Sequence, residues 1–404
     1  MSQPRPRLRI GLAGLGAATP NALPEIANHP DYRITAAADI RPEALARFAA
    51  EVGGETFESV EAMCQSPNVD VVHILTPNHL HAEHAIAAAN AGKQVICDKP
   101  MATSLAECDA MIAAAERNGV RLLIGHTQSL DAPIRRMAEI AGSGELGPVT
   151  MVNTWFFSDW LYRPRAAYEL EVSKGEGLVM RQGAVQVDIA RMVGGGLVKS
   201  VRAIASTVDP KRPIDGSYSA FLEFENGAAG TLVYNALGHF DSSELTFGIG
   251  LQGNLADPAT HARSHENIAR FGSAGQEWAY KDSTRYGGSR AQRPLTGPPS
   301  NPHHAFFGIT VASCERGDVR QSPDGLFVYD GKGRREIVIP EPAKRYTTTE
   351  LDLMYDAWWR DRPLALHDGG WGRATVEVCL GMLESSRTEG VVTMERQTAY
   401  ASSS

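Results

Sequence analysis

The 404-residue sequence has little that would suit a membrane or a nucleic acid. No apolar stretch approaches the roughly 18 consecutive residues that a membrane-spanning helix needs, and the longest are strand-sized, as at residues 71–75. No long basic run is present, and 39 Lys and Arg against 47 Asp and Glu give a net charge of -8. We therefore expect no nucleic-acid partner and no membrane partner.

Cysteine is also scarce. The five cysteines form no CxxC pair and their number is odd, which fits a reducing compartment better than a disulfide framework, so we expect a cytoplasmic protein. Zinc sites need clustered soft ligands. The spacing of His79, His81 and His84 resembles a ligand set, but no nearby carboxylate or cysteine completes it, and we expect no metal.

What is present is an ordinary globular composition, with 43% apolar and 21% charged residues over a length that suits two domains. The first 125 residues alternate short apolar runs with amphipathic segments, which predicts an α/β fold with a mostly parallel sheet. The expected strands are residues 8–12, 34–38, 69–75, 94–97 and 121–124, and the expected helices are residues 42–52, 81–91 and 105–118.

Beyond Gly147 the pattern changes. Strand-like runs at residues 149–157, 198–208, 219–224 and 229–235 follow one another with mainly Gly and Asn turns, which is typical of an antiparallel sheet. Residues 257–302 are rich in polar residues, Gly and Pro, and we expect them to form a long irregular excursion from this sheet.

A glycine turn follows the first expected strand and opens a helix. Gly14 permits the tight turn, and Gly16 lets a pyrophosphate approach the backbone at the positive end of the helix. Thr19 replaces the third glycine of the GxGxxG fingerprint, which weakens the match. Asp39, however, ends the second expected strand, where a carboxylate can bind both ribose hydroxyls. The combination predicts a dinucleotide site.

The same region bears on the choice of cofactor. Asp39 would repel a 2′-phosphate, which favours NAD, whereas Arg41 lies two residues on and could pair with one. We predict NAD, with NADP as the alternative.

Two further segments carry a resemblance to a known family. The run Thr-Pro-Asn-His-Leu-His at residues 76–81 follows one expected strand, and Cys-Asp-Lys-Pro at residues 97–100 ends the next. With Gly14 and Gly16, they resemble the glucose-fructose oxidoreductase, inositol dehydrogenase and MocA (Gfo/Idh/MocA) family of nicotinamide-dependent oxidoreductases. The likeness extends through residues 144–147 over nearly the whole chain.

The resemblance implies a two-domain architecture that agrees with the pattern above. We predict an N-terminal Rossmann dinucleotide-binding domain over residues 1–128. A C-terminal α+β domain over residues 129–404, with a large, mostly antiparallel open sheet, would bind a small-molecule substrate and mediate oligomers. The resemblance implies a homo-dimer or homo-tetramer.

Within the family, the chain looks most like the phthalate dihydrodiol dehydrogenase-like branch. The branch implies a dehydrogenase acting on CH-OH or CH-CH donors, with hydride passing from a secondary hydroxyl carbon of a small cyclic, carboxylated diol to nicotinamide. A sugar, glycoside or cyclitol dehydrogenase is the alternative, because a shared branch does not establish a shared substrate. The matching stretches are residues 159–165, 181–183, 186–188, 209–213, 239–241 and 313–318.

Lys99 is the strongest catalytic candidate. It corresponds to the lysine of the family's Glu-Lys-Pro motif, with Asp98 in place of Glu. A lysine at the end of a parallel strand projects into the crevice where the nicotinamide should lie. The alternative is that Lys99 only pairs with a carboxylate or orients the ribose.

The second domain departs from the commoner family pattern, in which an Asp and a His flank the substrate. Arg181 takes the position of the Asp, and an Arg suits a carboxylated substrate because its planar fork binds a carboxylate bidentately. Val185 takes the position of the His and cannot relay a proton. Either Lys99 and water carry proton transfer, or His126 or His304 has taken over, or the chain is a nucleotide-binding, catalytically silent relative.

Arg163 and Arg165 follow an aromatic pair and could clamp an anion, against the alternative of ordinary surface charge. The predicted substrate-binding residues are Arg163, Arg165, Arg181, Gln182, Val185 and Asp188. The predicted cofactor-binding residues are Gly14, Gly16, Ala17, Ala18, Asp39, Arg41, Thr76, Pro77, Asn78, His81, Asp98 and Lys99.

Overall fold

The computed structural model describes residues 6–125, 128–257, 262–291, 302–340 and 346–400. By its internal contacts the chain divides into two compact units. The first unit comprises Met1–His126, Trp278–Pro299 and Thr347–Arg373. The second comprises Thr127–Glu277, Ser300–Tyr346 and Ala374–Ser404.

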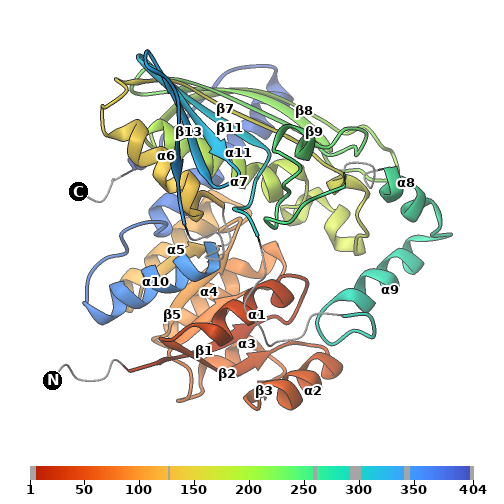
Figure 1. The fold of residues 1–404 in the computed structure, drawn as a ribbon. Helices are drawn as coiled ribbons and strands as arrows, with labels where there is room; N and C mark the ends of the chain where they lie inside the picture. Colours follow the sequence, from red (N-terminus) through yellow and green to blue (C-terminus); the bar gives the residue numbers. More distant parts are fainter. Residues whose placement is uncertain (1–5, 126–127, 258–261, 292–301, 341–345, 401–404) are drawn as a thin grey trace. The chain divides into compact units, whose positions relative to one another are not determined.

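The first unit contains a six-stranded sheet of order β3-β2-β1-β4-β5-β6 in which every pairing is parallel (Figure 1). Most of its residues are buried apolar side chains, as expected for a sheet covered on both faces. The strands are β1 (Leu8–Ala13), β2 (Tyr32–Ala38), β3 (Glu55–Phe57), β4 (Val71–Ile74), β5 (Gln94–Asp98) and β6 (Leu122–Gly125). The five predicted strands are confirmed, and β3 is an addition.

A local signal marks the start of helix α5 in the first unit. Helix α5 starts after Ser104, whose side chain accepts the Glu107 N–H, while Glu107 in turn accepts the N–H of Thr103, a reciprocal arrangement close to a capping box. The helices are α1 (Thr19–Asn28), α2 (Pro42–Glu51), α3 (Val60–Cys64), α4 (His81–Asn90), α5 (Leu105–Arg117) and most of α10 (Tyr346–Trp359).

Two segments distant in sequence complete the core of this unit. Leu351 of α10 and Tyr286 lie in the same buried apolar cluster as Ile10 and Phe48. Tyr32 donates its hydroxyl to the Leu351 carbonyl at 2.9 Å, and burial raises the pKa of Tyr32 well above its usual value. We had expected both segments in the second domain. Sequence alone shows that such residues are buried, but not which sheet they cover.

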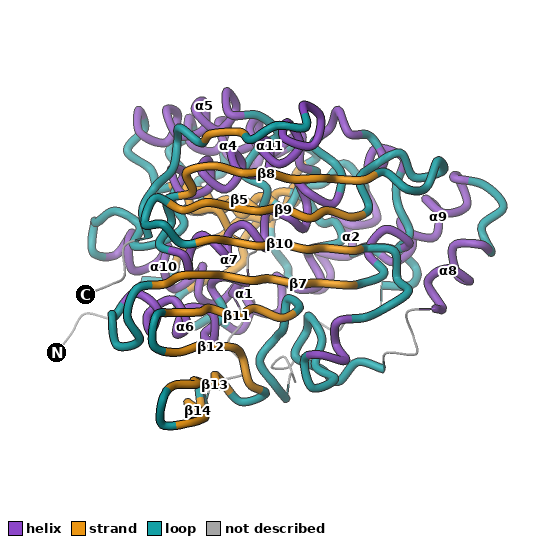
Figure 2. The backbone as a smooth tube through the Cα atoms, turned by 90° about the horizontal axis from the view of Figure 1, so that it is seen from above, coloured by secondary structure: helices purple, strands orange, loops and turns teal. Residues whose placement is uncertain are grey.

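The second unit contains a nine-stranded open sheet of order β14-β13-β12-β11-β7-β10-β9-β8-β15 (Figure 2). Among its pairings only β10 with β7 is parallel within the described residues, so the predicted mostly antiparallel open sheet is confirmed. The strands are β7 (Val149–Phe157), β8 (Val198–Ser206), β9 (Ser217–Phe224), β10 (Ala229–Asn235), β11 (Ile309–Cys314), β12 (Gly317–Ser322), β13 (Gly325–Asp330), β14 (Gly333–Val338) and β15 (Val392–Thr393).

Helices α6 (Ala132–Gly142) and α7 (Ala184–Gly194) pack against this sheet. Helix α11 (Gly369–Thr388) lies mostly in the second unit. Where an irregular excursion was predicted, the chain forms α8 (Ala262–Ala269) and α9 (Ala274–Thr284). None of the described helices is long and apolar enough to cross a membrane.

Candidate active site

The order of the first sheet reverses between β1 and β4, which lie side by side. Gly14 follows β1 and Thr76 closely follows β4, and the Leu75 N–H joins the two ends by donating to the Ala13 carbonyl at 2.8 Å. In open α/β sheets, ligands bind outside the carboxyl ends of the strands at such a reversal. The glycine turn and the segment after β4 therefore lie where a dinucleotide binds.

The glycine turn fits a pyrophosphate. Gly14 has a φ of +93°, which favours glycine, and a Cβ there would lie 3.0 Å from the Leu75 carbonyl. At Gly16 a Cβ would approach only that same carbonyl, at 3.9 Å, so the backbone is otherwise open. Thr19, in place of the third glycine, donates its hydroxyl to the Gly14 carbonyl at 3.3 Å and begins α1. Open backbone at a helix N-terminus suits a phosphate group.

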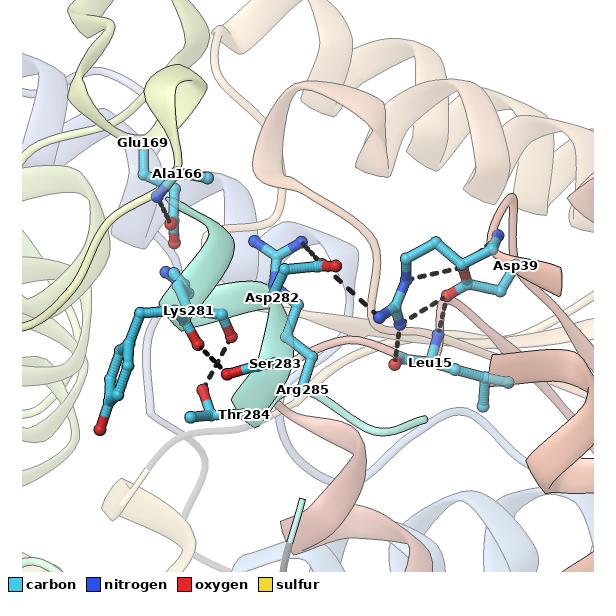
Figure 3. A network of polar contacts seen from close by, with 11 residues as sticks. Leu15, Asp39, Ala166, Glu169, Lys281, Asp282, Ser283, Thr284 and Arg285 are labelled. Carbon is cyan, nitrogen blue, oxygen red and sulfur yellow. Dashed lines mark hydrogen bonds and ion pairs between the residues drawn. The ribbon is translucent and has the colours of Figure 1, made fainter. Parts of the chain in front are cut away.

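Asp39 lies just after β2 and is held against the glycine turn. Its Oδ2 accepts the Leu15 N–H at 2.7 Å, and its Oδ1 accepts the Arg41 N–H at 2.8 Å and Arg41 Nε at 3.2 Å (Figure 3). Arg41 Nη2 donates to the Leu15 carbonyl at 2.6 Å. The carboxylate thus stands at the predicted ribose-reading position, with Arg41 folded beside it.

His81 ties together the two segments that follow β4 and β5. Its ring is 1% exposed, with Nδ1 2.8 Å from the Pro100 carbonyl and Nε2 2.9 Å from the Thr76 carbonyl. Carbonyl oxygens only accept, so a neutral ring satisfies one of them and a doubly protonated ring satisfies both. We had predicted His81 as a cofactor contact. Its burial and its partners make it a positioning residue for the two segments.

We expect His81→Ala to lower the melting temperature by several degrees and to lower turnover as well. At least one buried carbonyl would lose its donor, at about 1 to 3 kcal/mol. Thermal melting and steady-state kinetics measure both effects. His84→Ala on the same helix is the control, because the half-buried His84 contacts the Thr76 hydroxyl at 3.0 Å rather than two carbonyls. Equal, small effects for both variants would contradict the positioning role.

Lys99 follows β5, the strand next to β4, at the same carboxyl edge of the sheet. Its N–H donates to Asp98 Oδ1 at 2.7 Å, and its side chain is half-buried. The next residue, Pro100, is the one whose carbonyl contacts His81. The predicted catalytic lysine therefore lies on the edge where the glycine turn and Thr76 also lie.

In the second unit, Arg181 lies in the π-helical segment Val179–Gly183 that leads into α7. Its Nη1 is 2.8 Å from Glu176 Oε2 and 3.3 Å from Glu169 Oε1, and both glutamates are almost fully buried. Burial lowers the pKa of Arg181, but the Glu176 and Glu169 carboxylates outweigh it, so the pKa is raised overall. The cation predicted to meet a substrate carboxylate already has two carboxylate partners in the protein.

Arg181 is one of three arginines close enough to Arg165 to affect it electrostatically, and we call the four the arginine cluster: Arg163, Arg165, Arg181 and Arg212. Arg165 is 6% exposed, and its guanidinium lies 3.8 Å from the centroid of the Trp160 ring. Burial lowers the pKa of Arg165 to about 9. The positive charges of the other three arginines lower it too, whereas the Glu169 carboxylate raises it.

The other members of the cluster also have carboxylate partners. Arg163 pairs with Asp159 at 2.9 Å, and Arg212 pairs with Glu277 at 2.8 Å. Arg163 is the most exposed of the four, with 45% of its side chain accessible. The sequence predicts three of these residues as substrate contacts but not Arg212, whose only signal is its place in a stretch that matches the branch.

The remaining substrate-binding candidates in the second unit are Gln182, Val185 and Asp188, and each is buried or half-buried. Asp188 is 3% exposed and accepts hydrogen bonds from Ser129 and from Thr375, the latter at 3.3 Å. Val185 is 1% exposed on the same helix, and Gln182 is half-buried. Asp188 is therefore part of a buried hydrogen-bond network. The Val185 side chain has no hydrogen-bonding group and cannot relay a proton.

Of the two histidine candidates, the structure describes only His304. His304 is 3% exposed and donates from Nε2 to the Ile339 carbonyl at 2.9 Å, and burial lowers its pKa. His126 lies outside the described residues. Within the part of the chain that the structure describes, no three His, Cys, Asp or Glu side chains are grouped as metal ligands.

A parallel sheet of this order, with an open glycine turn after its first strand and an acidic residue after its second, is typical of a dinucleotide-binding Rossmann domain. Family models agree with this class. Residues 8–126 match the model described as "Oxidoreductase family, NAD-binding Rossmann fold", and residues 134–249 match the "GFO/IDH/MocA C-terminal domain". The chain belongs to the Gfo/Idh/MocA family, which confirms the predicted fold, enzyme class and NAD cofactor.

Individual relatives show which members of the family this chain resembles. The chain is 34% identical to a 1-carboxy-3-chloro-3,4-dihydroxycyclo hexa-1,5-diene dehydrogenase of Comamonas testosteroni, over 95% of this chain and 96% of the relative. A levoglucosan dehydrogenase of Pseudarthrobacter phenanthrenivorans is 28% identical over 54% of this chain and 63% of its own. The solved structure of a candidate dehydrogenase from Bordetella bronchiseptica RB50 superposes with a TM-score of 0.89, at 34% identity, over 96% and 100% of the two chains.

Proposed function

We propose that this protein is an NAD-dependent dehydrogenase of a small cyclic diol that carries a carboxylate. The observation that supports this most strongly is the 34% identity, over nearly both full lengths, to the Comamonas testosteroni dehydrogenase. The name of that relative describes a cyclohexadiene ring with a carboxylate and two hydroxyls. The arginine cluster supplies local cations, which a protein of net charge -8 needs in order to hold an anion.

The proposed reaction gives a part to four residues at the carboxyl edge of the first sheet, Gly14, Gly16, Asp39 and Lys99. NAD, when bound, supplies the hydride acceptor, and Gly14, Gly16 and Asp39 would hold it. A hydride leaves the carbinol carbon, and Lys99 accepts the proton of the same hydroxyl. For a cyclohexadiene diol whose second carbinol carbon carries a hydrogen, that proton then moves from the carbon to the oxygen of the new ketone, which yields an aromatic diol and favours oxidation.

The proposed carboxylate contacts are Arg163 and Arg181. Arg163 is the most accessible member of the arginine cluster, and Arg181 keeps 28% of its side chain exposed. Arg165 and Arg212 are almost fully buried, so they contribute charge rather than direct contact. A bidentate guanidinium–carboxylate contact is worth more than a neutral hydrogen bond.

Turnover of a substrate panel tests the proposal. The panel holds carboxylated dihydrodiols, uncharged dihydrodiols, inositols, simple sugars and levoglucosan, each with NAD and with NADP. We expect the highest kcat/KM for a carboxylated dihydrodiol with NAD. Preference for neutral sugars would instead favour a sugar, glycoside or cyclitol dehydrogenase, which the levoglucosan dehydrogenase relative supports. Binding of NAD without turnover of any member would favour a silent relative.

We also propose that the protein works as a homo-dimer or homo-tetramer in the cytoplasm. Apolar side chains project from one face of the second sheet, among them Trp155 at 47% and Phe221 at 51% exposure. All five cysteines are buried and none of them forms a disulfide bond, which agrees with a reducing compartment. Light scattering of the purified chain, compared with Phe221→Glu, tests the oligomer.

A further inference from the structure

Residues 278–291 comprise most of α9 and the residues that follow it, and they belong to the first unit, whereas α8 and the start of α9 belong to the second. Tyr286 anchors the segment: it is 3% exposed, and its hydroxyl donates to Glu51 Oε2 at 2.7 Å. The Arg47 guanidinium lies 4.9 Å from the centroid of the Tyr286 ring. Gly287 packs so closely on α2 that a Cβ would lie 2.6 Å from Ala44 Cα. The segment is fixed on the helix that begins just after Arg41.

This anchoring brings Asp282 to the Arg41 guanidinium. Arg41 Nη1 lies 3.7 Å from Asp282 Oδ1, and Arg285 Nη1 lies at the same distance from that oxygen (Figure 3). On its other edge, Arg41 donates to Asp39 and to the Leu15 carbonyl. The guanidinium, with 15% of its side chain exposed, is therefore held between two carboxylates.

We propose that Asp282 determines the preference of this enzyme for NAD over NADP. In Rossmann domains, an acidic residue after the second strand reads the ribose hydroxyls, whereas a nearby Arg accommodates a 2′-phosphate. This chain has both residues, Asp39 and Arg41. Asp282 compensates the charge of Arg41, holds it toward the glycine turn, and adds a negative charge that repels a phosphate.

Asp282 also restrains a second cation. Arg285 is 14% exposed and pairs with the same Asp282 oxygen that faces Arg41. Loss of the Asp282 charge would leave two guanidiniums less compensated beside the ribose position. The preference then depends on a residue that lies more than 200 positions from the glycine turn and outside every nucleotide-binding motif of the sequence.

Calorimetric titration of the full chain with NAD and with NADP tests the proposal for Asp282→Asn and Asp282→Glu. We expect Asp282→Asn to lower the Kd for NADP by about three- to tenfold, since a partly exposed charge next to a phosphate monoester is being removed. The Kd for NAD should stay within about twofold, because Asp39 is unchanged. Asp282→Glu should retain the parent preference. Because only nucleotide binding is measured, the outcome is independent of the proposed substrate.

Two controls test whether the effect depends on the position of the removed charge and on Arg41. Glu266→Gln removes the same charge from an exposed position of α8 and should leave both Kd values unchanged. In an Arg41→Ala background, Asp282→Asn should no longer improve NADP binding. The proposal is overturned by tighter binding of NADP than of NAD to the parent, by equal shifts for both cofactors, or by a gain that persists without Arg41. Asp282→Ser provides a second neutral variant should the amide destabilise the fold.

Discussion

Lys99→Ala is expected to lower turnover by about a hundred- to ten-thousand-fold while the Kd for NAD stays within a few-fold of the parent value. Loss of a positioned proton-transfer group typically has that effect on rate. Nucleotide binding should persist because the open glycine turn and Asp39 are formed by β1, β2 and the residues after them. Single-turnover kinetics and calorimetry measure the two quantities separately.

Lys93→Ala is the matched control, because Lys93 precedes the same strand at its opposite end. Its Nζ donates to the Ser66 and Val69 carbonyls, at 2.9 and 2.7 Å. Lys93 directly precedes β5, whereas Lys99 follows the carboxyl end of that strand. We expect a modest loss of stability and an unchanged turnover number. Near-normal turnover of Lys99→Ala would show that Lys99 is only structural. Lys99→Arg separates the two roles, since it keeps the charge but transfers a proton poorly.

The parallel sheet was predictable because its signal is local. Each of the five predicted strands is a short, buried apolar run bounded by turn residues, and the glycine turn falls where the first run ends. Strand β3 gave no such signal, since its three residues are exposed or half-buried. Helices α8 and α9 were missed for the same reason. No described residue of α9 is buried, so no apolar period marks it.

The partners of polar side chains were not predictable from spacing. The sequence placed His81 at the right edge of the sheet, but only the direction of the ring shows that it contacts two carbonyls. Arg181 likewise matched the branch, yet nothing in its motif indicates that Glu169 and Glu176 would be buried against it. Such contacts depend on how turns fold back over 5 to 12 residues, as their separations show.

Arg181→Ala is expected to destabilise the protein by about 3 to 5 kcal/mol, because removal of one partner leaves buried charge uncompensated. The side chains of Glu176 and Glu169 are 0% and 4% exposed, so both carboxylates are largely withdrawn from water when they lose the guanidinium. Arg163→Ala is the control for stability. Its ion pair with Asp159 is far more exposed, and such pairs contribute about 1 kcal/mol or less. Comparable melting temperatures for the two variants would contradict the structural role of Arg181.

The Arg181→Ala variant also tests whether Arg181 recognises the substrate carboxylate, provided that its effect on folding is separated from its effect on binding. Arg181→Ala should raise KM for a carboxylated diol far more than for an uncharged one, by a factor that corresponds to about 1.5 to 3 kcal/mol for a charged hydrogen bond. Glu176→Gln supplies the opposite perturbation, since it removes a carboxylate that lies 2.8 Å from Arg181 and leaves the cation less compensated. We expect it to lower KM for the carboxylated diol and to leave KM for the uncharged diol unchanged. Steady-state kinetics on both substrates, at temperatures well below the melting point of each variant, gives the four values. If both substrates respond equally to both variants, Arg181 stabilises the π-helical segment before α7 and does not recognise the carboxylate.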